Sequence, residues 1–273
     1  MLRVLSRALD IVVLPAIIVA LALAFLYAPP ERTMHDVYRI FYFHVPAATA
    51  SFLGFGIVFV CSILYLRTRE RRYDLVAAAA AEVGVLFCAM GIGMGMLWAK
   101  PVWGTFWIPG DIHLLATAVL FLIYVAYLMM RGAVADDERR ARLSAVVGVF
   151  AIIAVPVVFF SIRVIHVGNH PVLTSLDARM TTTLMFCMTV MMLFFTFILL
   201  RRVRLEFARE AAEGLRRDLL SLADARASGA ARPAGSRVVA GATPSIGGIT
   251  AGVPSSASNV AFSATRVDPR PRS

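Results

Sequence analysis

Six long apolar runs follow one another along the chain, and short polar or charged segments separate them. They extend over residues 11–27, 45–66, 75–97, 114–130, 143–165 and 181–200. A helix needs about 20 apolar residues to cross the hydrocarbon core of a bilayer, and the runs approach or exceed that length. The pattern predicts an all-α integral membrane protein with six transmembrane helices. Pro15 and Pro156 are expected to kink their helices unless neighbouring groups satisfy the freed carbonyls.

The basic residues are distributed unevenly between the two sets of connections. If the N-terminus lies inside, the inner segments carry 22 of the 27 Lys and Arg residues, and the outer loops keep five. Because inner loops of membrane proteins are enriched in Lys and Arg, the count predicts an N-in, C-in topology. The five outer basic residues are Arg32, Arg39, Lys100, Arg163 and Arg179.

The chain changes character after residue 200. Residues 1–200 are predicted to form one six-span domain with outer loops 28–44, 98–113 and 164–180. Residues 201–222 read as a cytoplasmic amphipathic basic helix, either lying against the lipid headgroups of the inner leaflet or simply solvated. Residues 223–273 are rich in Ala, Gly, Ser, Pro and Arg and poor in large apolar residues. Such a segment cannot bury a core, so a disordered cytoplasmic tail is expected.

Composition excludes most soluble classes. Of the 273 residues, 59% are hydrophobic and only 16% charged, which is typical of membrane proteins. The formal charge of +10 does not favour a nucleic-acid partner, because the arginines cluster beside the apolar runs. Cys61, Cys88 and Cys187 stand apart from one another and form no C-x-x-C pair, so disulfide, zinc and covalent c-haem sites are not indicated.

The predicted topology gathers the chemistry-bearing residues on one side. All five histidines and all three tryptophans of the chain fall in or beside the predicted outer loops: His35, His44, His113, His166, His170, Trp98, Trp103 and Trp107. Tryptophan and histidine are common near membrane interfaces, and this accounts for one or two of the residues better than for all eight. We therefore expect the functional face to be the outer one.

The stretch from Trp98 to His113, W-A-K-P-V-W-G-T-F-W-I-P-G-D-I-H, concentrates this chemistry. It contains every tryptophan, the only lysine, Lys100, and the polar pair Asp111 and His113. Aromatic rings with a few polar groups suit a flat ligand. The stretch is predicted to be a loop that binds such a ligand.

Two histidines next to prolines indicate what the flat ligand is. His44 precedes Pro46, which fits the first turn of the second span, and His170 precedes Pro171 in the fifth-to-sixth loop. Two neutral imidazoles beside aromatic rings suit axial ligation of haem iron. The haem propionates would need cations, and Arg39, Lys100, Arg163 and Arg179 are the candidates on that side. Each histidine taken alone is more often a hydrogen-bonding residue than a ligand.

Other activities have less support. The sequence has no G-x-S-x-G, H-E-x-x-H or Walker loop, so an enzyme working through side chains is not indicated. A haem-b redox subunit that reacts with quinone is an alternative, although such proteins usually place histidine pairs within their spans. A small-solute permease is another, but Glu82 stands nearly alone as an ionisable residue within the predicted spans.

These residues resemble a known family. F-Y-F-H-V-P-A-A at residues 41–48, W-A-K-P-V-W-G-T-F-W at residues 98–107 and H-P at residue 170 are similar to the CcmC-type haem-handling proteins of cytochrome c maturation system I, across the six-span region. The resemblance implies non-covalent, transient binding of haem b at the periplasmic face of the bacterial inner membrane. It also implies delivery to the periplasmic haem chaperone CcmE, alongside the membrane subunits CcmA, CcmB and CcmD.

The resemblance also implies the site residues. His44 and His170 correspond to the axial ligands, with His166 as the alternative to His170, and Trp98, Trp103, Phe106, Trp107 and Asp111 fall on the tryptophan-rich signature.

This chain departs from the family pattern W-G-T-W-W-x-W-D-x-R at the end of the signature. Phe106 replaces one tryptophan, Pro109 and Gly110 replace another with one residue inserted, and His113 stands at the arginine position. The Pro-Gly insertion is expected to re-aim Asp111, and His113 to supply a cation or compete as a ligand.

Overall fold

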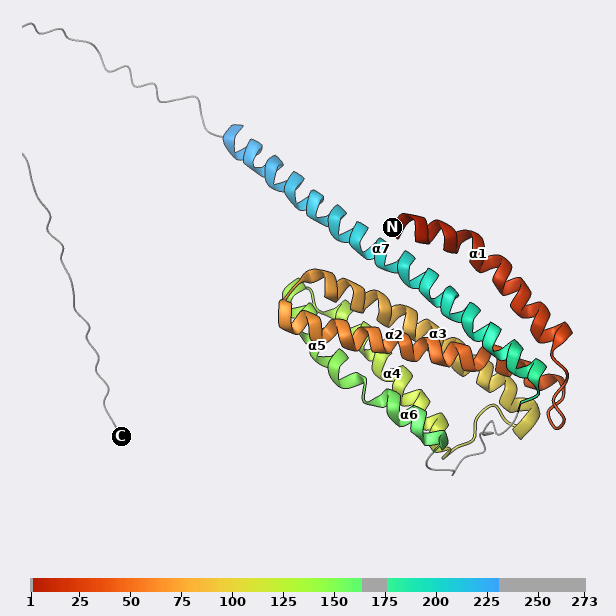
Figure 1. Ribbon diagram of the computed structural model, residues 1–273. Helices are drawn as coiled ribbons and strands as arrows, with labels where there is room; N and C mark the ends of the chain where they lie inside the picture. Colours follow the sequence, from red (N-terminus) through yellow and green to blue (C-terminus); the bar gives the residue numbers. More distant parts are fainter. Residues whose placement is uncertain (1, 164–175, 231–273) are drawn as a thin grey trace, which may run out of the picture. The chain divides into compact units, whose positions relative to one another are not determined.

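The computed structural model describes residues 2–163 and 176–230, and the regular elements within them are helices (Figure 1). In chain order they are α1 (Leu2–Ala22), the π-helical turn η1 (Leu23–Tyr27), the 3₁₀ turn η2 (Asp36–Ile40), α2 (Phe41–Thr68), α3 (Arg71–Trp103), α4 (Ile112–Ala133), α5 (Asp137–Ala151), α6 (Ala154–Arg163) and α7 (Ala178–Ala230). The chain divides into two units, Met1–Ala223 and Asp224–Ser273. All contacts described below lie within the first.

Six helical segments of the described chain are long and apolar enough to cross a membrane. They are Leu9–Tyr27, Asp36–Thr68, Arg71–Trp103, Ile112–Ala133, Asp137–Ser161 and Ala178–Arg226. Many of their large apolar side chains face outward, such as Leu26, which is 85% exposed, and Ile11 at 72%. Exposed apolar surface on this scale needs lipid around it. The predicted all-α integral membrane fold with six spans is confirmed.

The fifth span is broken rather than merely kinked. It consists of α5 and α6, which are separated at Ile152 and Ile153. Pro156 has no N–H to donate to the carbonyl of Ile152, and its ring collides with that carbonyl in a regular helix. The break therefore lies one turn before the proline, as the sequence leads one to expect.

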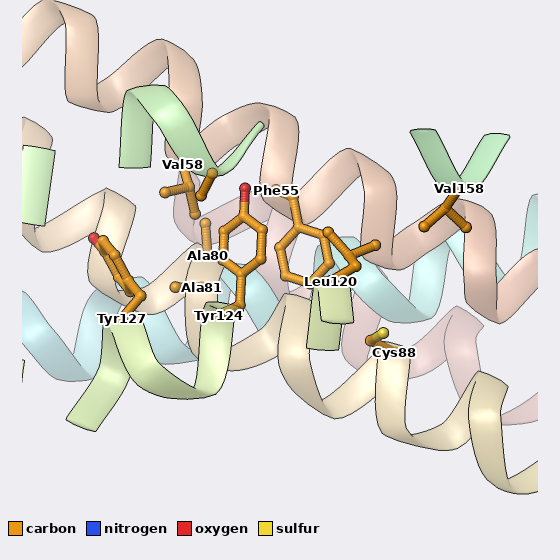
Figure 2. Close-up of a cluster of buried hydrophobic side chains, with 10 residues drawn as sticks. Phe55, Val58, Ala80, Ala81, Cys88, Leu120, Tyr124, Tyr127 and Val158 are labelled. Carbon is orange, nitrogen blue, oxygen red and sulfur yellow. The ribbon is translucent and has the colours of Figure 1, made fainter. Parts of the chain in front are cut away.

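Helices α2 and α3 form the antiparallel centre of the bundle. Gly54 and Gly84 let the two backbones approach closely, since a Cβ built on Gly54 would lie 3.0 Å from the Cα of Gly84. Small residues serve this purpose in membrane helix pairs, where dispersion contacts and not water exclusion drive packing. On one side α4, α5 and α6 complete a buried cluster in which the rings of Phe55 and Tyr124 stack at 3.7 Å (Figure 2).

Helices α1 and α7 pack together on another side of the central pair. Ala20 of α1 and Ala24 of η1 share a cluster with Leu184 and Cys187 of α7, and the thiol of Cys187 lies 3.8 Å from the carbonyl oxygen of Ala20. Phe195 of α7 packs on α2 and α3 in a further cluster. The three cysteines are free thiols.

Charged residues join the helices at the end of the bundle where α2 passes into α3. Asp74 is only 3% exposed and accepts hydrogen bonds from Arg71, at 2.8 Å, and from Arg131 of α4, at 3.0 Å. Glu82 accepts two hydrogen bonds from Arg202 of α7. The ion pair explains how an intramembrane carboxylate is tolerated here.

Residues 201–222 form part of α7, a single helix of 53 residues. This basic segment continues directly from the sixth span and is tied back to α3, since Arg71 also pairs with Glu210 at 3.3 Å. The predicted helix is present. Its position relative to a leaflet stays a prediction. Residues 223–230 of the predicted disordered tail belong to α7 and are helical, and the rest of the tail lies outside the described residues.

Candidate functional site

A pocket lies at the end of the bundle where α3 ends and α4 begins. Its cavity volume is about 80 Å³, room for a few water molecules. Helices α2 and α3 form one wall, α4 and α6 form the other, and the connection between α3 and α4 completes it. The lining residues that carry the argument are His44, Gly95, Trp103, Phe106, Trp107 and His113.

His44 reaches this pocket from the second turn of α2. The sequence places the helix start near Pro46, but α2 begins at Phe41 and continues from η2, so Pro46 lies within the helix. The imidazole Nδ1 of His44 lies 2.9 Å from the carbonyl oxygen of Gly91. A carbonyl can only accept a hydrogen bond, so Nδ1 carries the proton and Nε2 keeps the lone pair. Within the described part of the chain, that Nε2 has no hydrogen-bond partner.

Two glycines of α3 shape the place of this imidazole. Gly91 supplies the carbonyl, and a Cβ on Gly95 would lie only 3.0 Å from Cε1 of His44. The role of these two glycines beside His44 was not foreseen from the sequence. The signal available was the four-residue spacing of Gly91 and Gly95, which places them on one face of a helix.

His113 reaches the same pocket from the opposite wall. It lies in the first turn of α4, and its Nδ1 is 2.8 Å from the hydroxyl oxygen of Ser161 on α6. The Ser161 hydroxyl donates its proton to the carbonyl oxygen of Val158 at 2.7 Å. Ser161 was not foreseen from the sequence, since nothing local connects positions 48 residues apart.

The aromatic residues of the signature occupy two structural settings. The helix α3 continues to Trp103, so Trp98 and Trp103 are helical and contact each other edge-to-face at 5.0 Å. Trp98 is buried, at 9% exposure, whereas Phe106 in the connection is 48% exposed. The pocket is lined by Trp103, Phe106 and Trp107. Trp98 is not a lining residue and packs against Trp103.

The connection between α3 and α4 is shorter than the predicted 98–113 loop. Gly104 ends α3 at a φ of 75°, with its N–H donating to the carbonyl of Lys100. Pro109 and Gly110 then form a type II turn, in which Gly110 has a φ of 84° and the N–H of Asp111 lies 3.3 Å from the carbonyl oxygen of Ile108. The Pro-Gly insertion thus closes a tight turn directly before α4.

Asp111 is the N-cap of α4. Its Oδ1 accepts a hydrogen bond from the N–H of Leu114 at 3.0 Å, a favourable arrangement at a helix start. It is 6% exposed and is not among the residues that line the pocket. The Asp111 carboxylate therefore stabilises the helix that carries His113.

Two of the four cations expected near haem, Arg39 and Lys100, make contacts outside the pocket. Arg39 pairs with Asp36 at 2.9 Å and donates to the carbonyls of Ala24 and Ala28, which holds η2 against the end of η1. Lys100 donates to the carbonyl of Gly104 at 3.0 Å and lies over the ring of Phe106. Neither residue lines the pocket.

The connection before η2 is also ordered by local hydrogen bonds. The carboxylate of Glu31 accepts from the N–H groups of Met34, at 2.6 Å, and Thr33, at 2.8 Å. The hydrogen bond from Met34 contributes most to lowering the pKa of Glu31 below its ordinary value. This turn holds the chain just ahead of His44.

The second predicted ligand cannot be placed. His170 and its alternative His166 lie outside the described residues, as does Arg163 in its side chain. The structure therefore brings together His44, Trp103, Phe106, Trp107 and His113 out of the predicted site.

The fold and the pocket together define a class: a multi-pass helical membrane protein with an aromatic, histidine-bearing pocket at one end of its bundle. A family model described as heme exporter protein C matches residues 1–218. The chain belongs to this family, the CcmC family, as its signature residues had suggested.

Individual relatives agree with this assignment. The chain is 31% identical to heme exporter protein C of Bradyrhizobium diazoefficiens over 203 residues, which are 74% of this chain and 76% of the relative. It is 27% identical to heme exporter protein C of Escherichia coli over 181 residues, 65% and 74% of the two chains. It is also 33% identical to a putative cytochrome c biosynthesis ccmC-like mitochondrial protein of Marchantia polymorpha over 144 residues, 53% of this chain and 60% of that one.

Proposed function

We propose that this protein binds haem b non-covalently at the pocket between α3 and α4 and delivers it for cytochrome c maturation. The observation that carries the proposal is the setting of His44. Its Nδ1 is hydrogen-bonded to a backbone carbonyl, which fixes the ring and leaves Nε2 as the ligating nitrogen, as in many metal-binding histidines. Haem supplies the iron that accepts this nitrogen.

The surrounding residues suit a porphyrin. Trp103, Phe106 and Trp107 offer aromatic faces beside His44, and aromatic rings pair with flat apolar rings by stacking or edge contact. A porphyrin is larger than the cavity, so we expect the connection between Gly104 and Asp111 to move when haem binds. His170, or His166 in its place, is proposed as the second axial ligand.

The family relationship supports a role in haem export and the choice of proposed partner proteins. Relatives bear the name heme exporter protein C, and we propose the same role here: a binding and delivery protein, not an enzyme. Its proposed partners are the haem chaperone CcmE, the membrane subunits CcmA, CcmB and CcmD, and the lipid bilayer. The pocket would face the periplasm from the bacterial inner membrane, with both termini inside, as the distribution of basic residues favours.

The visible spectrum of detergent-purified protein from haem-producing cells tests this function. We expect a Soret band in the wild type and its loss in His44→Ala. The matched control is His35→Asn, because His35 is exposed and lies outside the pocket. Wild-type protein without haem after gentle extraction would contradict the proposal, and reduction of the haem by quinol would favour the redox-subunit alternative.

A further inference from the structure

The part of α7 that follows the sixth span carries an apolar stripe, which we call the leucine stripe. Its four leucines and two alanines recur at intervals of three and four residues: Leu205, Ala208, Ala212, Leu215, Leu219 and Leu222. This is the pattern of a and d positions in a helix that packs along another helix. All six residues are exposed, and the exposed fractions of the leucines run from 45% to 61%.

The leucine stripe points away from the bundle. Glu206, Glu210 and Glu213 of α7 line a cavity of about 540 Å³ together with residues of α3, α4 and α5, and Glu210 pairs with Arg71 at 3.3 Å. In a helix with 3.6 residues per turn, these glutamates and the leucine stripe lie on opposite sides. Among the described residues, the rest of the bundle therefore lies behind the stripe and leaves it exposed.

The far end of the stripe lies beyond the reach of the bilayer. The sixth apolar run ends at residue 200, and α7 continues from it as one unbroken helix (Figure 1). At a rise of about 1.5 Å per residue, Leu215 lies about 22 Å and Leu222 about 33 Å past that point. The headgroup layer extends only about 5–8 Å beyond the hydrocarbon on each side. Exposed leucines in water at regular spacing indicate a protein partner.

Arginines along one edge of the stripe indicate the chemistry of that partner. Arg209, which also pairs with Glu206 at 3.1 Å, and Arg216 occupy e positions, and both are exposed. Charges at e and g positions pair with opposite charges on the neighbouring helix. Two copies of α7 in one membrane run parallel, so Arg209 of one copy would meet Arg204 of the other, and Arg216 would meet Ala211. The charges thus disfavour a second copy and favour an acidic helix.

We propose that the leucine stripe binds an amphipathic helix of a partner protein, in which Asp or Glu residues flank the apolar seam. The two seams pack together, and the acidic side chains pair with Arg209 and Arg216. The partner is held at the end of the bundle where α2 passes into α3, and the histidine pocket lies at the other end. The proposal is independent of haem binding.

Fluorescence anisotropy of a labelled synthetic helix, measured with the detergent-purified full chain, tests the proposal. The probe peptide carries Leu at its a and d positions and Glu at e and g, and a second peptide carries Lys in place of Glu. Since exposed ion pairs contribute up to about 1 kcal/mol each, we expect the Lys peptide to bind at least about fivefold more weakly.

Variants of α7 identify the surface that binds. Leu215→Ser/Leu219→Ser should weaken binding of the Glu peptide at least about tenfold, because apolar contact area is lost. The matched control is Leu220→Ser, because Leu220 is 55% exposed and lies beside the stripe, not in it. Thermal unfolding of the variants should match the wild type, since the substituted side chains are exposed.

Several results would overturn the proposal. The Glu peptide could fail to bind, the Lys peptide could bind as tightly, or Leu220→Ser could weaken binding as much as the double variant. A dimer without peptide that Leu215→Ser/Leu219→Ser makes monomeric would show that a second copy covers the stripe. In lipid nanodiscs, stronger quenching of Leu219→Trp than of the wild type by brominated lipid would show that the bilayer covers it.

Discussion

The most direct test of the site geometry is the substitution Gly95→Ala. A Cβ at this position would lie 3.0 Å from Cε1 and 3.4 Å from Nδ1 of His44. Carbon atoms in contact prefer a separation of about 3.5–4.0 Å, so the imidazole has to shift by roughly 0.5 Å. Gly95 and Gly91 share a face of α3, so the shift also stretches the bond of Nδ1 to the carbonyl of Gly91, now 2.9 Å.

The shift lengthens the hydrogen bond between Nδ1 of His44 and the carbonyl oxygen of Gly91 beyond the usual limit of about 3.2 Å. A hydrogen bond of this kind contributes about 1 kcal/mol, and loss of a partner that orients a metal ligand typically weakens metal binding by about 10- to 100-fold. We expect haem affinity to fall about tenfold, the lower end of that range, because the bond is stretched and not removed.

Titration of purified haem-free protein with haem, followed at the Soret band, measures the affinity. Gly93→Ala is the matched control, because no heavy atom lies within 4 Å of its built Cβ, and both substitutions change helix propensity equally. The reasoning is refuted if Gly95→Ala binds haem as tightly as the wild type, or if Gly93→Ala weakens binding to the same extent.

Three further predictions concern the cap, the buried ion pairs and the tail. Asp111→Ala should lower the free energy of unfolding by about 1 kcal/mol and weaken haem binding. If the carboxylate acts only as a cap, Asp111→Ser should restore both. Thermal unfolding measures the stability, and haem titration measures the binding. Asp74→Asn should lower the free energy of unfolding by about 3 kcal/mol, because it leaves Arg131 buried without its charge partner. The control is Asp137→Asn, which should cost less than about 1 kcal/mol, because the Asp137 side chain is half-exposed. Thermal unfolding in detergent measures both changes. Deletion of residues 223–273 should leave the haem content per protein unchanged, because the pocket is built from α2, α3, α4 and α6, and a lost Soret band would show that the tail contributes to binding.

The structure shows the conformation of residues 109–113, where the chain departs from the family pattern. The proline and glycine form a turn, the aspartate caps α4, and His113 projects into the pocket that holds His44. The sequence leads us to expect that the insertion re-aims Asp111 and that His113 supplies a cation or competes as a ligand. The structure shows Asp111 as the cap of α4, and both expectations stay predictions.

The sequence by itself determined the membrane fold, the number of spans and the family. These follow from local properties: the length and apolarity of each run, the helix-breaking effect of Pro156 and a compact block of tryptophans. The same local character explains why His44, Trp103, Phe106 and Trp107 could be chosen as site residues before their positions were known.

Only the tertiary structure decided how each residue is used. The bond of His44 to Gly91 and that of His113 to Ser161 join positions 47 and 48 residues apart, and no local pattern encodes such a pairing. Arg39 and Lys100 looked like ligand-binding cations because their charge is visible in the sequence. Their nearest acceptors are carbonyl groups of neighbouring turns, which become available only where the folded backbone leaves helix ends unpaired.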